Sequence, residues 1–301
     1  MIKMEKISHN RLFWGHVVAV AVVACWGGTF VNTKYLLMGG LAPHEIFLCR
    51  FLLAYVAIWS VSPRRLFCSG WRDELLMALL GLSGGSLYFL SENWAVGISY
   101  VNNVAFIVCT APLLTTILAI LFFRSVRATP ALIIGSLVAL TGVALVIFNG
   151  HFVLHLNPLG DALALGAALC WSVYSLLMKR ASTRYSSVFI TRKVFFYGLL
   201  TILPVFIFQP WHFPLERLLE PVIWMNIVFL GLIASFVCFV LWNWSIARIG
   251  AMRSSNYIYL NPVTTLIASA IFLHEPMTTM AYAGSVLILV GVFVANRSDG
   301  I

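Results

Sequence analysis

One acidic residue lies deep inside an apolar stretch of the sequence. Glu92 occurs in the run Leu90-Ser91-Glu92-Asn93-Trp94, five residues before Gly97. In a helix that rises about 1.5 Å per residue, its carboxylate lies about 7 Å from the end of the element. A carboxylate in an apolar environment costs free energy unless it faces a partner or a polar cavity. Glu92 is therefore a candidate for binding a substrate amine or a coupling proton; a structural ion pair, or a helix end deeper in water, would also account for it.

Aromatic and polar side chains recur near the centres of the apolar stretches. Three pairs have spacings of three or four residues, which puts both members on one helical face: Trp26 with Thr29, Trp171 with Tyr174, and Tyr88 with Glu92. Buried polar tips need partners, so these faces are expected to line a cavity, although packing is the commoner use of a buried aromatic ring. The predicted substrate-binding residues are Trp26, Thr29, Tyr88, Glu92, Asn93, Trp171, Tyr174, Asn243 and Tyr259.

Other polar or special residues have two interpretations each. Pro112 and Pro262 fall at mid-helix, where a proline frees a carbonyl and bends the helix, so each is either a working hinge or a fixed kink. Lys34 is expected to extend to the outer interface, and a pair with Glu92 is possible. Arg50 and the Arg192-Lys193 pair are expected to anchor the starts of their helices.

Composition shows what kind of elements must hold these residues. Hydrophobic residues make up 61% of the 301 residues and charged residues 10%, against about 25% charged residues in a soluble globular protein. Most of the outer surface must therefore face lipid. The net charge of +9 comes from Lys and Arg in short turns such as Pro63-Arg64-Arg65 and Lys179-Arg180, a pattern that argues against nucleic acid as a partner.

The apolar runs have the length of membrane-spanning helices, about 20 residues each. We expect ten spans, near residues 15–37, 44–61, 75–97, 102–123, 129–148, 158–178, 188–208, 222–247, 253–273 and 278–296. The first run has no convincing cleavage site and is expected to remain as a helix. Fourteen Lys and Arg residues occupy the terminal segments and alternate turns, against Arg217 alone in the other set. Both termini are therefore predicted to be cytoplasmic, in a cell membrane and most plausibly a bacterial inner membrane.

An internal duplication relates the two halves of the chain. Matching residues occur at offsets of 145, 150 and 149: Cys25-Trp26 with Cys170-Trp171, Asn93-Trp94 with Asn243-Trp244, Phe89 with Phe239, Pro112 with Pro262, Gly135 with Gly284 and Gly142 with Gly291. The predicted domains are residues 1–150 and 151–301, with five helices each. An odd number of spans makes the second repeat enter the membrane from the opposite side, an inverted repeat typical of alternating-access transporters.

Several motifs then resemble the EamA-like branch of the drug/metabolite transporter superfamily. They are Cys25-Trp26-Gly27-Gly28-Thr29-Phe30, Arg50-Phe51-Leu52-Leu53-Ala54, Asn103 through Pro112, Ser254 through Pro262, His274-Glu275-Pro276 and Gly284 through Val292. The resemblance covers nearly the whole chain and implies export or exchange of small metabolites, including amino acids in some members. One departure is Arg124-Ser125, where the family often has Gly-Glu; the second-half counterpart His274-Glu275 keeps the acid.

These observations predict an all-α integral membrane protein that is a secondary transporter and not an enzyme. Its expected partners are membrane lipid and a small-molecule substrate, for which amino acids or similar amphipathic solutes are favoured. A coupling proton is the candidate coupling ion. No cofactor is expected, because no Walker motif is present, and His151 and His155 have no third metal ligand nearby. The alternatives are an intramembrane enzyme, which would need a catalytic constellation, and a receptor-like protein without transport activity.

Overall fold

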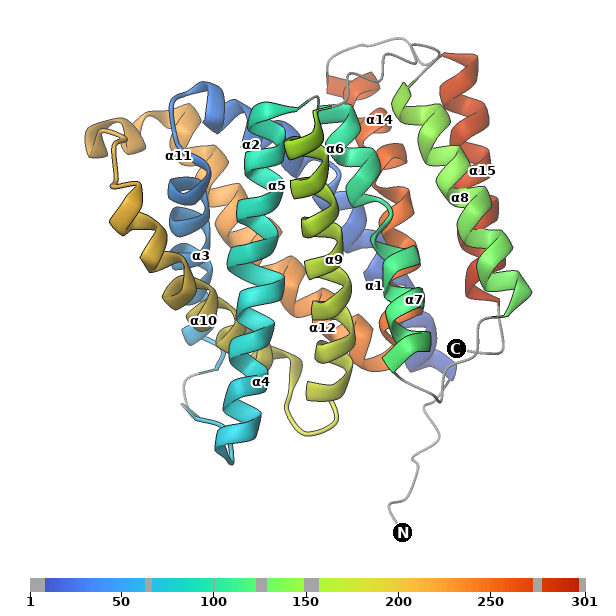
Figure 1. Ribbon diagram of the computed structural model, residues 1–301, viewed down its shortest axis with the longest axis horizontal. Coiled ribbons are helices and arrows are strands. Elements are labelled where there is room, and N and C mark those ends of the chain that lie inside the picture. Colours follow the sequence, from blue (N-terminus) through green and yellow to red (C-terminus); the bar gives the residue numbers. More distant parts are fainter. Residues whose placement is uncertain are drawn as a thin grey trace.

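The computed structural model describes residues 9–62, 67–99, 101–122, 129–148, 157–272 and 278–297, and in these ranges the chain forms helices and no strands. Up to residue 150 the elements are α1 (His9–Trp26), α2 (Thr29–Met38), α3 (Pro43–Trp59), α4 (Trp71–Gly81), the π-helix η1 (Leu82–Ser86), α5 (Leu87–Ile98), α6 (Val101–Val108), α7 (Ala111–Phe122) and α8 (Pro130–Phe148). They continue as α9 (Pro158–Ala181), α10 (Ser187–Phe208), the 3-10 helix η2 (Leu215–Leu219), α11 (Pro221–Val228), the π-helix η3 (Phe229–Val237), α12 (Cys238–Ile249), α13 (Ala251–Asn256), the 3-10 helix η4 (Tyr257–Leu260), α14 (Asn261–Phe272) and α15 (Thr279–Asn296). Figure 1 shows them as one bundle, with the start of α1 and the end of α15 at the same end.

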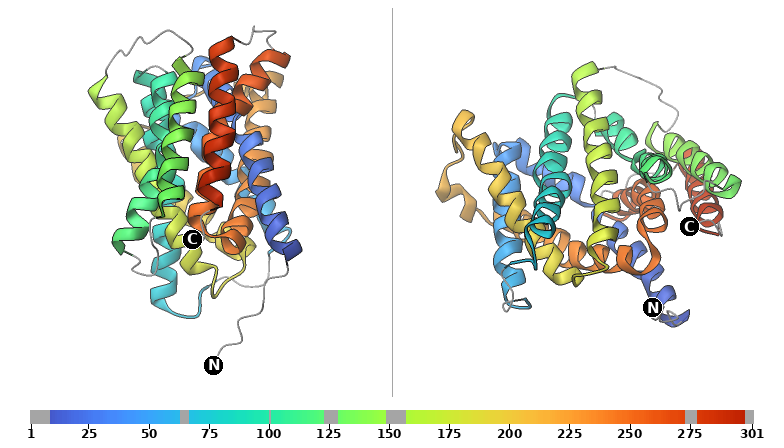
Figure 2. Two further views of the ribbon diagram at one scale, coloured as in Figure 1. Left: turned by 90° about the vertical axis from the view of Figure 1, so that its right-hand side faces the viewer. Right: turned by 60° about the horizontal axis from the view of Figure 1, so that its bottom comes forward.

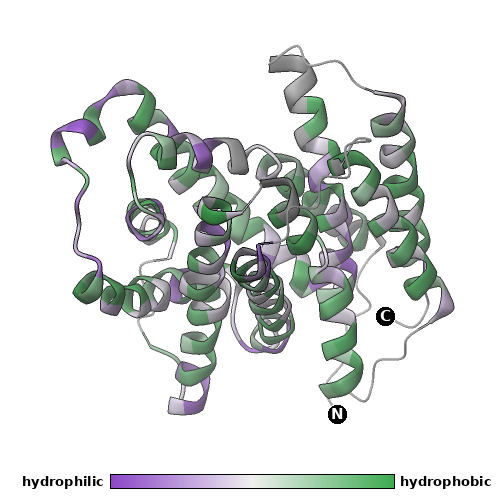
Figure 3. Cartoon of the chain, turned by 45° about the horizontal axis from the view of Figure 1, so that its top comes forward, coloured by the Kyte–Doolittle hydropathy of each residue, from purple (hydrophilic) through white to green (hydrophobic). Residues whose placement is uncertain are grey.

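Within the described ranges, seven helical stretches are long and apolar enough to cross a bilayer: 71–98, 104–122, 130–147, 158–181, 187–208, 221–249 and 279–296. The other three predicted spans fall on helices that are interrupted or shorter. The first is divided between α1 and α2, the second coincides with the 17-residue α3, and the ninth is divided among α13, η4 and α14. Figure 3 shows hydrophobic residues along most of the helices. Many large hydrophobic side chains are exposed, such as Ile134 and Val286. An apolar outer surface fits lipid as the solvent.

Irregular backbone occurs where helices meet near the centre of the bundle. The break between α1 and α2 falls at Gly27, where a Cβ atom would lie 2.1 Å from the Thr264 hydroxyl, so only glycine lets these segments approach. The π-helices η1 and η3 occupy corresponding positions under the offset of 150. In η1 the ring of Tyr174 lies against Gly84, where a Cβ would come within 2.2 Å of it. Such π-helical segments often occur at functional sites.

The two repeat-related prolines begin helices and do not bend them at their middles. Pro112 is the second residue of α7 and Pro262 is the second residue of α14. Each follows an interruption, the Cys109-Thr110 turn in one case and η4 in the other. The expectation of mid-helix prolines is therefore corrected, because in the first turn the missing N–H has no helical partner to lose. Whether these interruptions act as hinges stays a prediction.

Helices α8 and α15 pack against each other at one side of the bundle (Figures 1 and 2). A Cβ on Gly135 would lie 2.7 Å from the Gly291 carbonyl oxygen, and one on Gly142 would lie 2.6 Å from the Gly284 carbonyl oxygen. The contact moves forward along α8 as it moves backward along α15, so the helices run antiparallel. Small residues allow this close approach of two backbones, as is common between membrane helices.

Candidate functional site

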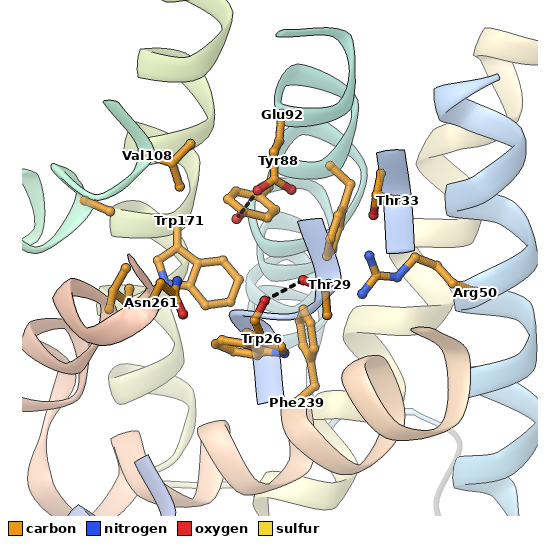
Figure 4. A pocket seen from close by; sticks show the side chains of 13 residues that line it. Trp26, Thr29, Thr33, Arg50, Tyr88, Glu92, Val108, Trp171, Phe239 and Asn261 are labelled. Atoms are coloured by element: carbon orange, nitrogen blue, oxygen red, sulfur yellow. Dashed lines mark hydrogen bonds between the residues drawn. The ribbon is translucent and has the colours of Figure 1, made fainter. Parts of the chain in front are cut away.

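A cavity in the centre of the bundle contains most of the features predicted to bind a solute. It has about 610 Å³ of empty space, which includes space open to solvent. Its lining comes from ten elements that lie on both sides of residue 150: Trp26 of α1, Thr29 and Thr33 of α2, Arg50 of α3, Tyr88, Phe89 and Glu92 of α5, Val108 of α6, Ala111 of α7, Trp171 of α9, Phe239 of α12, Ile258 of η4 and Asn261 of α14. Figure 4 shows these side chains around the space.

Glu92 supplies the negative charge of the cavity. Its side chain is buried, and the Tyr88 hydroxyl, one turn earlier on the same face of α5, donates to its Oε1 at 3.1 Å. Oε2 accepts no hydrogen bond from the residues that the structure describes. The possible pair with Lys34 is absent, because that side chain lies exposed on α2 and no described cation is within 4 Å of the carboxylate. A carboxylate with one free oxygen in a cavity can bind an ammonium group or a proton.

Arg50 supplies a positive charge on another wall of the same cavity. It is the eighth residue of α3, and only 4% of it is exposed. Its Nε donates to the Ser235 hydroxyl at 2.9 Å, and its guanidinium lies 4.3 Å from the centre of the Phe89 ring. The expectation that Arg50 anchors a helix at the membrane interface is therefore wrong, because its side chain turns inward to Ser235 and Phe89.

The two opposite charges do not neutralise each other directly. No nitrogen of Arg50 comes within 4 Å of a Glu92 carboxylate oxygen in the described structure, and Figure 4 shows the two groups on different walls of the space. The Nη atoms of Arg50 have no hydrogen-bond partner among the described residues. Buried charges are normally paired, because the loss of hydration is costly. An unpaired cation and anion on one cavity suit a ligand that carries both charges.

Aromatic rings make up much of the remaining wall. Trp26 and Trp171, which are equivalent under the predicted repeat, meet edge to face with ring centres 5.4 Å apart. The ring centres of Tyr88 and Trp171 lie 5.0 Å apart, and those of Phe239 and Trp26 lie 5.9 Å apart. Trp26 Nε1 donates to a carbonyl of η3, that of Ala234, at 2.9 Å, whereas Trp171 Nε1 is buried without a partner in the described structure. These rings give an apolar surface with an available N–H donor.

Four predicted binding residues lie outside the lining of this cavity. The Tyr174 hydroxyl donates to Asn243 at 2.6 Å, and the Asn243 amide donates to Thr191 at 2.9 Å, which joins α9, α12 and α10. Asn93 and Tyr259 are also buried away from the cavity. The contacts of Tyr174, Asn243 and Thr191 hold three helices together. A role in substrate binding stays a prediction for all four residues. Five predicted residues do line the cavity: Trp26, Thr29, Tyr88, Glu92 and Trp171.

Several lining residues were absent from the predicted site. Arg50 carried a signal, since a charge inside an apolar run is costly, but its proximity to the start of the run favoured an anchor. Phe89 and Phe239 carried another, because they are equivalent under the repeat. Thr33, Val108, Ala111, Ile258 and Asn261 have no distinguishing pattern in the sequence. Their place in the lining depends on how neighbouring helices rotate against one another.

A second group of buried charges lies toward the start of α4. Lys193 forms an ion pair with Glu74, whose carboxylate also accepts from the Tyr197 hydroxyl at 2.6 Å and the Cys68 amide at 2.8 Å. Arg192 donates to the Ser62 carbonyl. Arg192 and Lys193 are thus buried partners of α4 and the end of α3, which corrects the prediction that they anchor α10 in the interface. Among described residues, no three His, Cys, Asp or Glu gather as metal ligands; His151 and His155 lie outside them.

The chain is similar to proteins from archaea and bacteria along nearly its whole length. An "uncharacterized transporter" of Archaeoglobus fulgidus is 27% identical, over 93% of this chain and 98% of that protein. A "probable terminal-alkyne amino-acid exporter" of Streptantibioticus cattleyicolor is 28% identical, over 96% and 94%. A "probable amino-acid metabolite efflux pump" of Escherichia coli is 24% identical, over 92% and 93%.

The fold also has a counterpart among solved structures. A crystal structure with 18% sequence identity superposes with a TM-score of 0.75 and covers 93% of this chain and 97% of its own. At that identity the likeness shows the fold alone. The EamA-like transporter family model matches residues 13–148 and again residues 158–297. The apolar helices and this match across both parts of the sequence lead to one conclusion: the chain is a multi-pass membrane protein that belongs to the EamA-like transporter family.

Proposed function

We propose that this protein is a secondary transporter that exports amino acids or similar zwitterionic, amphipathic metabolites across the cell membrane. The observation that carries the proposal is the central cavity, on which Arg50 and Glu92 lie unpaired beside an aromatic wall. An α-carboxylate would bind the guanidinium and an α-ammonium would bind the carboxylate, since charge-assisted hydrogen bonds are the strong ones. The side chain of the substrate would lie against the tryptophan rings.

The names of two relatives agree with this substrate class, since they describe an amino-acid exporter and an amino-acid metabolite efflux pump. Sugar phosphates fit less well, because a phosphate dianion asks for more than one cation and Arg50 is the one cationic residue among the described residues of the lining. No cofactor has a part in this mechanism. A proton on Glu92 in place of the substrate amine would couple export to proton entry, which makes the proton the proposed coupling ion.

The proposed mechanism is alternating access by two inverted five-helix repeats, with ten spans and both termini in the cytoplasm. Three observations support it. The family model matches twice, once in each half. The start of α1 and the end of α15 lie at the same end of the bundle. The contact of Gly135 with Gly291 corresponds, under the repeat, to the contact of Gly284 with Gly142, as a two-fold axis between antiparallel α8 and α15 would require.

Counterflow into proteoliposomes tests the proposal. The purified protein is reconstituted, the vesicles are loaded with an unlabelled solute, and uptake of the labelled solute is followed for aliphatic and aromatic amino acids, their decarboxylated amines, and sugar phosphates. We expect uptake of at least one amino-acid class above that of empty liposomes, and less uptake by Glu92→Gln. Transport of sugar phosphates alone would refute the substrate class, and no uptake of any solute by folded protein would count against transport of this panel.

A further inference from the structure

A groove, separate from the central cavity, opens at the end of the bundle where α4 begins and α9 ends. It has about 990 Å³ of empty space, including space open to solvent. The two helices contact each other, and in Figure 1 the start of α4 and the end of α9 both lie at the lower end of the bundle. The lining residues are Arg72, Asp73, Leu75, Leu76 and Leu79 of α4, Leu177 and Arg180 of α9, and Thr183 and Arg184 of the following turn. Its chemistry is therefore divided into a cationic part and a leucine part.

The charged part has an excess of positive charge. Arg184 donates to Asp73 at 2.9 Å, and the Tyr185 hydroxyl donates to the same carboxylate at 2.8 Å, so that negative charge is already satisfied. Arg72 and Arg180 have no carboxylate partner within 4 Å in the described structure. The start of α4 also has no side-chain cap, because its N-cap residue is Gly70. The first turn of α4 already contains the carboxylates of Asp73 and Glu74, which are paired with Arg184 and Lys193, so Arg72 and Arg180 are the charges with which an anion would interact here.

The apolar part continues from this end along α4. Trp71, Leu75 and Leu79 are spaced four residues apart and form one stripe on the helix, and they are 73%, 52% and 42% exposed. A tryptophan at one end of an exposed apolar stripe is typical of the membrane interface, where the ring lies at the level of the headgroups. Leu177 of α9 lines the groove opposite these leucines. A ligand for both parts must carry an anionic head and a hydrocarbon chain.

We propose that this groove binds an anionic phospholipid, with its phosphate at Arg72 and Arg180 and an acyl chain along Leu75, Leu79 and Leu177. Basic pockets between membrane helices are known to recognise such headgroups. The inference depends on neither the proposed substrate nor the leaflet that this end faces. Because α4 lies in the first half of the chain and α9 in the second, a bound lipid would contact both halves at once.

The test compares two lipids that differ only in the headgroup. The purified protein in detergent is titrated with palmitoyl-oleoyl phosphatidylglycerol or phosphatidylcholine, and native mass spectrometry gives the affinity of the first tightly bound lipid. We expect a preference for phosphatidylglycerol that falls in the Arg72→Gln, Arg180→Gln double variant by about fivefold per arginine, the equivalent of about 1 kcal/mol each. The double variant Lys34→Gln, Arg217→Gln removes the same charge from exposed positions elsewhere and should keep the preference.

Three further experiments distinguish a lipid site from a site for free phosphate and from binding elsewhere. Inorganic phosphate and glycerol phosphate, each added in excess, should not displace the lipid; if either does, the site binds free phosphate and the proposal of a lipid is wrong. Equal binding of both lipids to the wild-type protein would also overturn it. In wild-type protein alone, phosphatidylglycerol with a photoreactive acyl chain should label peptides that contain residues 71–79 and 177–184. Labelling confined to other helices would refute the site even if the variants failed to fold.

Discussion

The substitution Arg50→Gln gives the most direct test of how the central cavity selects its substrate. The variant keeps a polar, though shorter, side chain and removes the one cation among the described lining residues. If the guanidinium binds the α-carboxylate, its loss removes hydrogen bonds to a charged group, which contribute about 1.5–3 kcal/mol. That difference corresponds to about a 10- to 150-fold change in affinity. The same loss should not weaken the binding of a ligand that has no carboxylate.

The measurement is a ratio of affinities, obtained by competition in counterflow between an amino acid and its decarboxylated amine. In the wild-type protein the amino acid should compete better by the factor above, and in Arg50→Gln the ratio should approach one. A ratio is needed because the substitution also breaks the contacts of Arg50 with Ser235 and Phe89. A smaller folded fraction would reduce transport of both ligands equally and leave the ratio unchanged.

The matched control is Ser235→Ala, which removes the hydrogen bond to Arg50 Nε and leaves the charge in place. We expect this variant to keep most of the preference for the amino acid. If the preference of Arg50→Gln equals that of the wild-type protein, Arg50 does not bind the carboxylate, and its charge has a purely structural role. If Ser235→Ala loses the preference as completely as Arg50→Gln, the position of the guanidinium and not only its charge decides recognition.

Three other predictions follow from the structure. Glu92→Gln should reduce the preference for an amino acid over its deaminated carboxylic acid. If Glu92 carries the coupling proton, the variant should also lose the stimulation of uptake by an imposed pH gradient. Unchanged responses in both assays would exclude both roles. Gly142→Leu should lower the free energy of unfolding by about 1–3 kcal/mol, because a Cβ there would lie 2.6 Å from the Gly284 carbonyl oxygen. The control is Gly166→Leu, where nothing lies within 4 Å of a Cβ, and thermal unfolding should show little loss of stability for this variant. Glu74→Gln leaves the buried Lys193 without its ion pair. Because the Glu74 side chain is 23% exposed, we expect a loss of about 1.5–3 kcal/mol, below that for a fully buried pair. Glu220→Gln, in the exposed pair with Arg217, should cost no more than about 1 kcal/mol, and equal losses would contradict the burial argument.

The sequence was a good guide to features that depend on a single helix. Apolar runs of membrane length, separated by short basic turns, predicted a multi-pass membrane protein, and the family model agrees with the resemblance found in the motifs. The depth of Glu92 in its run, and its spacing from Tyr88, placed both side chains on one face, where the structure finds them on the cavity. Repeat equivalence singled out Trp26 and Trp171, whose rings meet there. Each of these inferences needs only the rise and period of a helix.

What the sequence did not provide was the packing of one helix against another. Tyr174 shares a helical face with Trp171, and their ring centres lie 5.3 Å apart, yet the Tyr174 hydroxyl donates to Asn243 of α12 and only Trp171 lines the cavity. Gly27, at the break between α1 and α2, permits the close approach of Thr264, a residue far away in the sequence. The predicted start of the helix that contains Arg50 was nearly right, but only the packing of α3 against η3 and α5 turns Arg50 into the cavity.

The sequence by itself therefore determined that the chain lies in a membrane, which stretches are helical, and which side chains carry costly polar groups in an apolar environment. Only the tertiary structure decided which of those groups meet. The physical reason is that the hydrophobic pattern fixes how each helix faces its own surroundings, whereas contacts between helices depend on close packing at positions such as Gly27, Gly84 and Gly142. The unpaired charges of Arg50 and Glu92 on one cavity are a product of that packing.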